Sequence, residues 1–410
     1  MTIAIIGAGP AGLMAAEILS AAGHDVTVYE RMPTPGRRFL MAGVGGLNLT
    51  HGEDFERFIG RYRDGLALLR PALDALPPEA LRGWADGLGA DTFVGSSGRV
   101  FPKAMKASPL LRAWLGRLEG QGVRFALRHD WTGWVGDALT FDTPDGPLTV
   151  TPDATVFALG GASWPKLGAD GSWVAPFEAQ SVPVAPLRPS NAGLLIDWSD
   201  HLVERHAGAP LKPVTFDFSG EAIQGEVVLT RTGMEGGAAY ALSGLIREQT
   251  LTVGKVIVSI DLKPGLTRDA LAERLATARK GDSLSNILRK QARLSPAATA
   301  LLNEDRNLPR EPEALARRIK CRPLIIHGLS GLDRAISTAG GVMAEALDPA
   351  FMMHARPGSF VAGEMLDWEA PTGGYLLQAS FATGAWAAQG VIGYLAARSI
   401  NTRSAIPPSL

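Results

Sequence analysis

Residues 2–30 read TIAIIGAGPAGLMAAEILSAAGHDVTVYE, and they decide the fold. Ile3–Ile6 is a short apolar run, which is typical of a buried parallel strand. The residues from Ala11 to Ala22 are mostly Ala, Leu, Ile and Met, so they predict a helix that ends at Gly23. Asp25–Glu30 alternates and contains β-branched residues, which predicts a second strand.

The turn between the first strand and the helix carries Gly7, Gly9 and Gly12 in the spacing G-x-G-x-x-G. Gly7 permits the tight turn, Gly9 lets a pyrophosphate approach the backbone, and Gly12 lets helix and strand pack closely. The N–H groups at the helix start face the phosphates. Glu30 can accept both ribose hydroxyls of an adenosine and repels a 2′-phosphate, which favours FAD or NAD over NADP. We therefore predict a Rossmann-like dinucleotide site; the alternative is an ordinary glycine-rich turn.

The composition is that of an ordinary globular protein. The 410 residues suggest two or three domains, with 46% hydrophobic and 20% charged residues. The net charge is −1, and we expect the basic residues to be dispersed. Such a chain has no global field that attracts nucleic acid or an anionic membrane, so a nucleic-acid partner is not expected.

Cys321 is the only cysteine, which excludes an internal disulfide, a dithiol mechanism and a cysteine-based metal site. We expect no metal. The N-terminus has no charged leader, so no signal peptide is expected. Residues 382–397 are apolar but interrupted by glycines, which indicates a buried helix rather than a membrane span. Together these features favour a cytoplasmic protein.

The chain after Glu30 predicts a further set of elements. Asp54–Leu88 reads as helices broken at Pro71 and at Pro77–Pro78. Ser108 is a candidate N-cap for a helix that runs to Gly120. Val123–Arg128 and Ala138–Phe141 are typical of strands, and Thr155–Gly161 predicts another buried parallel strand.

The composition changes near residue 186. Residues 186–262 alternate between apolar and polar, as in Val214–Phe218 and Glu226–Thr230, which predicts an antiparallel sheet or small barrel. Residues 263–334 are helical and charged. We therefore predict a discontinuous α/β FAD-binding domain (1–185 and 335–410) that is interrupted by a β-rich subdomain (186–262) and a helical subdomain (263–334).

The end of the chain again has glycines where a ligand is expected. Ser337–Val342 predicts a glycine-rich turn, and Gly358–Gly363 a short strand followed by Glu364. Gly363–Glu364 would hold the ribityl chain of a flavin. The turn at Gly373–Gly374 would direct the start of a long helix at the pyrimidine side of the ring, where the helix dipole stabilises negative charge. This second ligand-facing segment favours FAD over NAD.

Six segments carry a resemblance to a known family: GAGPAG, GRRFLMAGVGGLNLTH, GRVFP, FALGGASWPKLGADG, STAGGV and FVAGEMLDWEAPTGGYLLQ. In this order they resemble the BaiN-like bacterial NAD(P)/FAD-dependent oxidoreductases, over about residues 1–395. The resemblance implies a glutathione-reductase-type FAD domain with a β-rich and a helical insertion. Many members have Gly-Arg-Cys-Asn-Leu-Thr where this chain has residues 45–50, GGLNLT, so a role of that Arg or Cys cannot be assumed.

The motifs and the resemblance together imply a set of cofactor-binding residues. The choice between Arg37 and Arg38 for the pyrophosphate rests on charge alone, and the resemblance favours Arg37. The resemblance also places the adenine near the backbone of Trp131. The predicted FAD-binding residues are Gly7, Ala8, Gly9, Pro10, Ala11, Gly12, Glu30, Arg31, Arg37, Asn48, Leu49, Thr50, Trp131, Ala158, Gly160, Gly161, Gly363, Glu364, Asp367, Gly373, Gly374, Tyr375 and Leu376.

The catalytic residue is less well specified, because hydride transfer to flavin N5 needs mainly orientation and sometimes an acid or base. His51, after the Asn-Leu-Thr turn, and Lys166, after Gly160–Gly161, are the catalytic candidates. The alternative for each is a solvated loop residue. Lys103, Tyr375, Gln378 and His327 are weaker candidates, and His327 is more simply a satisfied interdomain histidine.

We predict an FAD-dependent oxidoreductase that transfers hydride between flavin N5 and an unidentified small molecule or NAD(P)H, with the insertion forming much of the substrate pocket. The sequence contains no second strand-GxGxxG-helix unit, so NAD(P)H would be a transient donor. Two alternatives stay open: a flavin-binding protein with structural or sensory FAD and a partner-binding insertion, and an NAD-binding protein.

Overall fold

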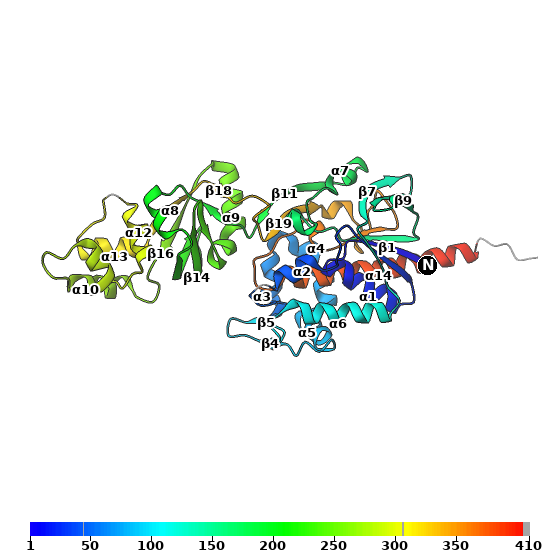
Figure 1. Ribbon diagram of the computed structural model, residues 1–410, viewed down its shortest axis with the longest axis horizontal. Coiled ribbons are helices and arrows are strands. Elements are labelled where there is room, and N and C mark those ends of the chain that lie inside the picture. The colour runs from blue at the N-terminus through cyan, green and yellow to red at the C-terminus, as the bar shows by residue number, and fades with distance from the viewer. Residues whose placement is uncertain (44, 306, 405–410) are drawn as a thin grey trace, which may run out of the picture. The chain divides into compact units, whose positions relative to one another are not determined.

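The computed structural model describes residues 1–43, 45–305 and 307–404 (Figure 1). The chain forms two compact units: Met1–Arg188 with Ser337–Leu410, and Pro189–Ile336. The chain therefore leaves the first unit once and returns to it once. Residues 405–410, which the sequence assigned to the FAD domain, lie outside the described residues.

A parallel five-stranded sheet forms the centre of the first unit, with the strand order β20-β10-β1-β2-β6. In the register, Ile5 of β1 pairs with Val28 of β2 and with Val156 of β10, and all three are fully buried. Strands buried on both faces need continuous apolar runs, which is why the opening residues could be assigned from sequence. The bounds are β1 Thr2–Ile6, β2 Asp25–Glu30, β6 Arg124–Leu127, β10 Ala154–Phe157 and β20 Ser359–Val361.

The two ends of the chain pack together through helices α1 (Pro10–Ala21) and α14 (Tyr375–Ser404) (Figure 1). Small residues allow this close approach. A Cβ on Gly384 of α14 would lie 2.2 Å from the Ala11 carbonyl oxygen, and one on Gly363 would lie 2.9 Å from the Ala11 Cβ. The sheet and these helices form one hydrophobic core with α6 (Ala107–Gly120).

The remaining elements of the first unit surround this core. β7–β9 form an antiparallel meander, β3, β5 and β4 form a small sheet, and β11 pairs with β19. Their bounds are α2 Arg37–Ala42, β3 Thr50–His51, α3 Phe55–Ile59, η1 Gly60–Gly65, α4 Leu66–Ala75, α5 Pro78–Asp86, β4 Phe93–Val94, β5 Arg99–Phe101, β7 Asp130–Val135, β8 Ala138–Thr143, β9 Gly146–Val150, η2 Pro165–Leu167, α7 Val174–Ala179, β11 Val184–Ser190, β19 Ser337–Val342, η3 Ala344–Ala346 and η4 Gly363–Met365.

The second unit is an antiparallel seven-stranded sheet with helices. Its strand order is β17-β16-β13-β14-β15-β12-β18, and the predicted alternating segments lie in the paired strands β13 and β14. Strand β17, at the edge of the sheet, comes after the helices α10–α13 in the chain. Buried side chains of the sheet and of these helices form one hydrophobic core. The bounds are β12 Leu194–Leu195, α8 Asp200–His206, β13 Pro210–Phe218, β14 Glu221–Thr230, β15 Gly233–Glu235, α9 Gly237–Val253, β16 Val256–Asp261, α10 Arg268–Ala276, α11 Leu284–Lys290, α12 Pro296–Asn303, α13 Pro312–Lys320, β17 Arg322–Ile326 and β18 Gly328–Leu329.

The predicted α/β class with a parallel sheet and inserted strands and helices is confirmed. The division of the insertion at residue 262 stays a prediction. Among the described residues, each helix is too short or too polar to cross a membrane.

Three local predictions are wrong. Pro71 lies inside α4; it is exposed, so water can satisfy the carbonyl group that a proline leaves unpaired. Ser108 lies within the first turn of α6, whose N-cap is Lys106. Ser337–Val342 is a strand and not a turn, and its glycines serve close packing: a Cβ on Gly340 would lie 2.2 Å from the Pro186 oxygen.

We expect Gly384→Ala to destabilise the protein even though alanine favours helices, because the new methyl group would collide with the Ala11 carbonyl. The cost of such overpacking is about 1–3 kcal/mol. The matched control is Gly393→Ala in the same helix, which is exposed and has no neighbour within 4 Å; it should stabilise by up to about 1 kcal/mol. Chemical unfolding of both variants measures the difference. Equal effects would show that α1 and α14 do not pack closely.

Candidate functional site

The carboxyl ends of β1, β10 and β20 meet at one edge of the sheet, and the opening glycines lie there. Gly7 has φ +106°, and a Cβ on it would lie 2.4 Å from the Ala158 oxygen. A Cβ on Gly12 would lie 2.0 Å from the Gly7 oxygen. Gly9 differs from both, since a Cβ there would meet nothing within 4 Å. Two glycines are therefore needed for packing, whereas Gly9 leaves open space beside the turn, as a bound pyrophosphate requires.

Helix α1 begins beside this open space without a side-chain cap. Its N-cap is Gly9, and Pro10 occupies the first helical position. The free N–H groups and the positive end of the helix dipole are thus left for an anion.

Glu30 ends β2 next to the turn and is held in place by two backbone groups. Its Oε2 accepts from the Ala8 N–H and its Oε1 from the Met32 N–H, each at 2.8 Å. Burial raises the pKa of Glu30, although these hydrogen bonds and the nearby Arg31 and Arg37 act to lower it. Each carboxylate oxygen keeps a further lone pair, so the side chain can still accept two ribose hydroxyls.

Three of the predicted cofactor residues bury a polar atom that has no hydrogen-bond partner within the described part of the chain. These atoms are Arg37 Nε, Asn48 Oδ1 and Trp131 Nε1. Buried polar groups in native proteins are nearly always paired, and an orphaned one calls for an explanation such as a missing ligand. FAD carries donors and acceptors along its whole length, so these residues fit it.

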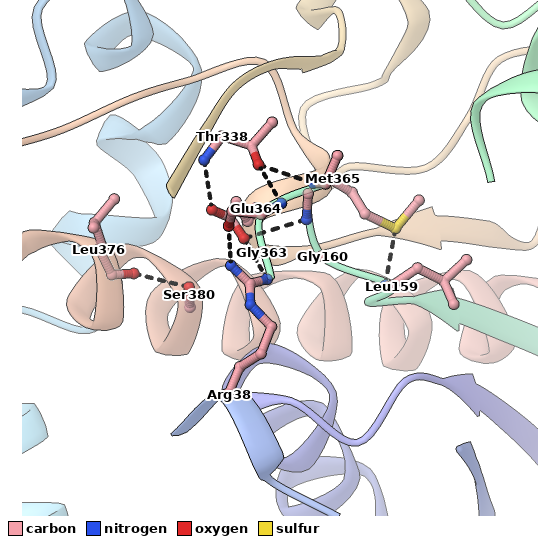
Figure 2. Close-up of polar contacts among 12 residues, drawn as sticks. Arg38, Leu159, Gly160, Thr338, Gly363, Glu364, Met365, Leu376 and Ser380 are labelled. Carbon is pink, nitrogen blue, oxygen red and sulfur yellow. Dashed lines mark hydrogen bonds and ion pairs between the residues drawn. The ribbon is translucent and has the colours of Figure 1, made fainter. Parts of the chain in front are cut away.

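Arg38 and Glu364 form an ion pair at the same sheet edge (Figure 2). Arg38 Nη1 lies 2.5 Å from Glu364 Oε2, and Glu364 also accepts from the Thr338 N–H at 2.9 Å and the Gly161 N–H at 3.2 Å. The Arg38 charge is therefore matched inside the protein. Of the two arginines considered for the pyrophosphate, Arg37 keeps the unpaired nitrogen, and this favours Arg37.

Thr338 is a member of this network that the sequence did not identify. Its hydroxyl oxygen accepts from the N–H groups of Ala162 at 2.8 Å and Ser163 at 3.1 Å, which shapes the loop after β10. The glycines of STAGGV predict a turn, and a turn assignment gives Thr338 no defined position.

The start of α14 contacts the loop that contains Asn48, Leu49 and Thr50. A Cβ on Gly374 would lie 2.5 Å from the Thr50 carbonyl carbon. The Thr50 hydroxyl donates to Gln378 Oε1 at 2.7 Å, and both residues are fully buried. Predicted cofactor residues more than 300 positions apart in sequence are thus brought together here.

Tyr375, the first residue of α14, is buried and takes part in a polar cluster that reaches the surface at Arg61. Its hydroxyl donates to Glu53 Oε1 at 2.5 Å, and Arg61 pairs with the other Glu53 oxygen at 2.8 Å. Burial and the bond to Glu53 raise the pKa of Tyr375, so the phenol stays protonated. Burial acts to raise the pKa of Glu53, but the hydrogen bonds from Arg61 and Tyr375 outweigh it and lower that pKa.

His51 stacks on the Tyr375 ring, with ring centroids 5.5 Å apart. Its Nδ1 accepts from the Glu53 N–H at 3.2 Å, and Nε2 lies 3.1 Å from the Ser97 carbonyl oxygen. Both contacts are satisfied when Nε2 carries the proton. His51 is thus an ordered histidine beside the start of α14.

Lys166 lies elsewhere, on the exposed 3-10 turn η2. The same loop packs on the residues after β2: a Cβ on Gly168 would lie 2.8 Å from the Met32 side chain, and Asp170 pairs with Arg31 at 2.7 Å. Lys166 is therefore in a loop beside the Glu30 end of the site, whereas His51 lies beside α14.

The other predicted residues occupy varied environments. Trp131 packs on Phe157 at the end of β10, with ring centroids 5.1 Å apart. Burial raises the pKa of Asp367, with a contribution from Glu369. Among the weaker candidates, Lys103 is exposed 4.0 Å from Asp91, Gln378 is buried, and His327 of the second unit lies 3.1 Å from Asp197. Cys321 is exposed.

Comparison with known proteins confirms the resemblance seen in the motifs. The HI0933-like protein Rossmann domain matches residues 1–390. The chain is 26% identical to a 3-dehydro-bile acid delta(4,6)-reductase of Clostridium scindens, covering 98% of this chain and 99% of that protein. It is 25% identical to a ribosomal RNA dihydrouridine synthase of Escherichia coli, covering 93% and 96%.

Among solved structures, the open conformation of a flavocytochrome c3 fumarate reductase matches with a TM-score of 0.52 and 14% identity, covering 96% of this chain and 78% of that one. At this identity the match supports the fold alone.

We expect Glu30→Ala to weaken FAD binding about 10–100-fold, because hydrogen bonds to a charged group contribute about 1.5–3 kcal/mol. Titration of the apoprotein with FAD, followed by flavin fluorescence, gives the dissociation constant. Asp25→Ala is the matched control: Asp25 begins the same strand, and its partner Arg124 is exposed. Circular dichroism checks that both variants are folded. FAD binding as tight as in the parent would mean that the adenosine end of the site lies elsewhere.

Proposed function

The chain belongs to the HI0933-like Rossmann family and is an FAD-dependent oxidoreductase; from this premise we propose that it reduces a carbon–carbon double bond conjugated to a carbonyl group. The names of two full-length relatives support this reaction type. A delta(4,6)-reductase of a 3-dehydro-bile acid and a dihydrouridine synthase both add hydrogen across a carbon–carbon double bond. The bile-acid derivative and uridine differ in size and polarity, so what they share is the conjugated double bond.

The observation that supports the FAD site, on which the proposed reaction depends, is the set of unpaired buried atoms of Arg37, Asn48 and Trp131 together with the uncapped start of α1. The α1 N–H groups and Arg37 would neutralise the pyrophosphate, and Glu30 would hold the adenosine ribose. Bound FAD would supply hydride in its reduced form. The positive end of the α14 dipole, beside Asn48–Thr50, suits the ring end of the cofactor, where negative charge accumulates on reduction.

Reduction of such a bond also needs one proton, because hydride adds to the carbon remote from the carbonyl and a proton adds to the nearer one. Two side chains at the start of α14, those of Tyr375 and His51, are candidates to donate this proton. The Tyr375 hydroxyl donates a hydrogen bond to Glu53, and the raised pKa of Tyr375 makes loss of its proton difficult. The His51 ring can take up a second proton, because the Glu53 carboxylate lies 3.7 Å from its Nδ1, and an imidazolium releases a proton more readily than a phenol does. We therefore propose His51 as the acid and retain Lys166 as the weaker candidate.

The electrons must come from a donor, for which we propose NADH or NADPH in a transient complex. The sequence contains only one G-x-G-x-x-G turn of the strand-turn-helix kind, and the proposed FAD site uses it. A nicotinamide donor that binds only briefly does not need a second G-x-G-x-x-G turn.

We expect the purified protein to be yellow, and anaerobic NADH or NADPH to bleach it. An enone such as a 4-en-3-one steroid should then restore the colour and be consumed in an equal amount. A yellow protein that dithionite bleaches but no enone reoxidises would favour structural or sensory FAD. A colourless preparation that binds NAD would favour the NAD-binding alternative.

We expect His51→Asn to lower enone turnover at least tenfold, since positioned acids typically contribute about 10²–10⁴-fold. The asparagine oxygen can still accept from the Glu53 N–H, which keeps the loop in place. Flavin content and reduction by dithionite should be unchanged. His24→Gln, outside the proposed site, is the control. Turnover equal to that of the parent would remove His51 from the mechanism.

A further inference from the structure

The net charge of −1 conceals an uneven distribution, so the expectation of dispersed basic residues is wrong. Residues 263–322 contain 14 Lys and Arg but only 7 Asp and Glu. This part of the second unit is therefore strongly positive, and the rest of the chain is negative. A local field of this kind acts on a partner whatever the charge of the whole chain.

The excess lies in residues 274–293, which we call the basic segment. It comprises the last turn of α10, the loop after it, α11 and the turn that follows. It contains one acidic residue, Asp282. The Asp282 carboxylate accepts a hydrogen bond from the Arg279 backbone N–H, within the loop between α10 and α11. Its six basic residues are all exposed: Arg274, Arg279, Lys280, Arg289, Lys290 and Arg293.

These six side chains lack ion-pair partners. Three acids near the segment pair with other bases: Asp269 with Arg268, Asp305 with Arg318, and Asp261 with Lys320. Across the described ranges, no carboxylate lies within ion-pair distance of any of the six. Their charges are therefore available to a partner.

Hydrogen bonds bring the two ends of the segment together. The Thr277 hydroxyl, at the end of α10, donates to Gln291 Oε1 at 3.1 Å, just after α11. Lys263 Nζ lies 3.3 Å from the Arg293 carbonyl oxygen, and Arg310 Nη1 lies 3.4 Å from that of Asp282. Two further basic residues thus adjoin the segment, and the charges form a patch rather than a line.

Helix stability accounts for part of this charge. Arg274, Arg289 and Lys290 lie in the last turns of their helices, where basic residues stabilise the negative end of the dipole. Arg279, Lys280 and Arg293 lie outside the helices. Stabilisation of the helix dipole therefore does not explain their presence.

We propose that the basic segment is a binding surface for the phosphate backbone of a folded RNA. Arginine, which supplies four of the six charges, pairs with phosphate in a bidentate manner. A membrane surface suits the segment less well, because surface-bound helices also insert apolar side chains. The described residues between 263 and 322 expose no large apolar side chain. The name of the Escherichia coli relative includes ribosomal RNA, which is consistent with this partner.

The test uses the flavin-loaded protein in the oxidised state, so that it does not depend on the proposed reaction. A fluorescein-labelled RNA hairpin is titrated at several salt concentrations, and its anisotropy is followed. We expect binding whose logarithm falls with the logarithm of salt concentration with a slope of about −4 to −5, for six phosphate contacts. Replacing Arg279, Lys280, Arg289 and Lys290 by Gln should weaken binding at least tenfold and reduce the slope by about 3. Flavin content and enone turnover should stay those of the parent.

The matched control replaces four exposed bases of the same unit, Arg205, Lys212, Arg231 and Lys255, by Gln. It changes the net charge equally and should alter RNA affinity less than twofold. Equal losses in both variants, or unchanged binding after substitution of the basic segment, would overturn the proposal. So would binding to phosphatidylglycerol vesicles without binding to RNA, which would identify a membrane surface instead.

Discussion

The close contact of Ala11 with Gly363 and Gly384 is the constraint on which the first unit depends. It joins the start of the first helix to a turn and a helix from the end of the chain. A side chain larger than hydrogen at either glycine would force the two segments apart. The contact with Gly384 is between backbones, and it holds the start of α1 against α14 beside the polar links from Arg38 to Glu364 and from Thr50 to Gln378.

The site follows from this contact because the strand ends and both helix starts come to one edge of the sheet. The start of α1 is uncapped, and the start of α14 lies against Thr50. If FAD binds as proposed, the dipole of α1 would act on its pyrophosphate and the dipole of α14 on its ring, which gains negative charge on reduction. At this edge the charges of Arg38 and Glu364 are paired with each other, whereas single polar atoms of Arg37, Asn48 and Trp131 have no partner among the described residues.

Local parts of this arrangement could be predicted from sequence, and long-range parts could not. The strand, turn and helix of residues 2–30 depend on neighbours in sequence, so apolar runs and glycine spacing were sufficient. The second strand through Glu30 and the long closing helix were predictable for the same reason. The bond from Thr50 to Gln378 and the network around Thr338 join residues far apart in sequence, for which no periodicity carries a signal. Pro71 misled because its effect depends on exposure, which sequence does not reveal.

The effect of charged residues also depends on where the fold places them, as it does for the glycines. A net charge near zero argues against polyanion binding only if positive and negative residues are mixed. In residues 263–322, Asp269 pairs with Arg268 and Asp305 with Arg318, whereas the six bases of the basic segment face solvent together. Self-repulsion in such a patch costs stability, and capping of two helix ends offsets it only for the residues within those helices. For Arg279, Lys280 and Arg293, which lie outside the helices, an external anion is the simplest explanation of why so much positive charge is gathered there.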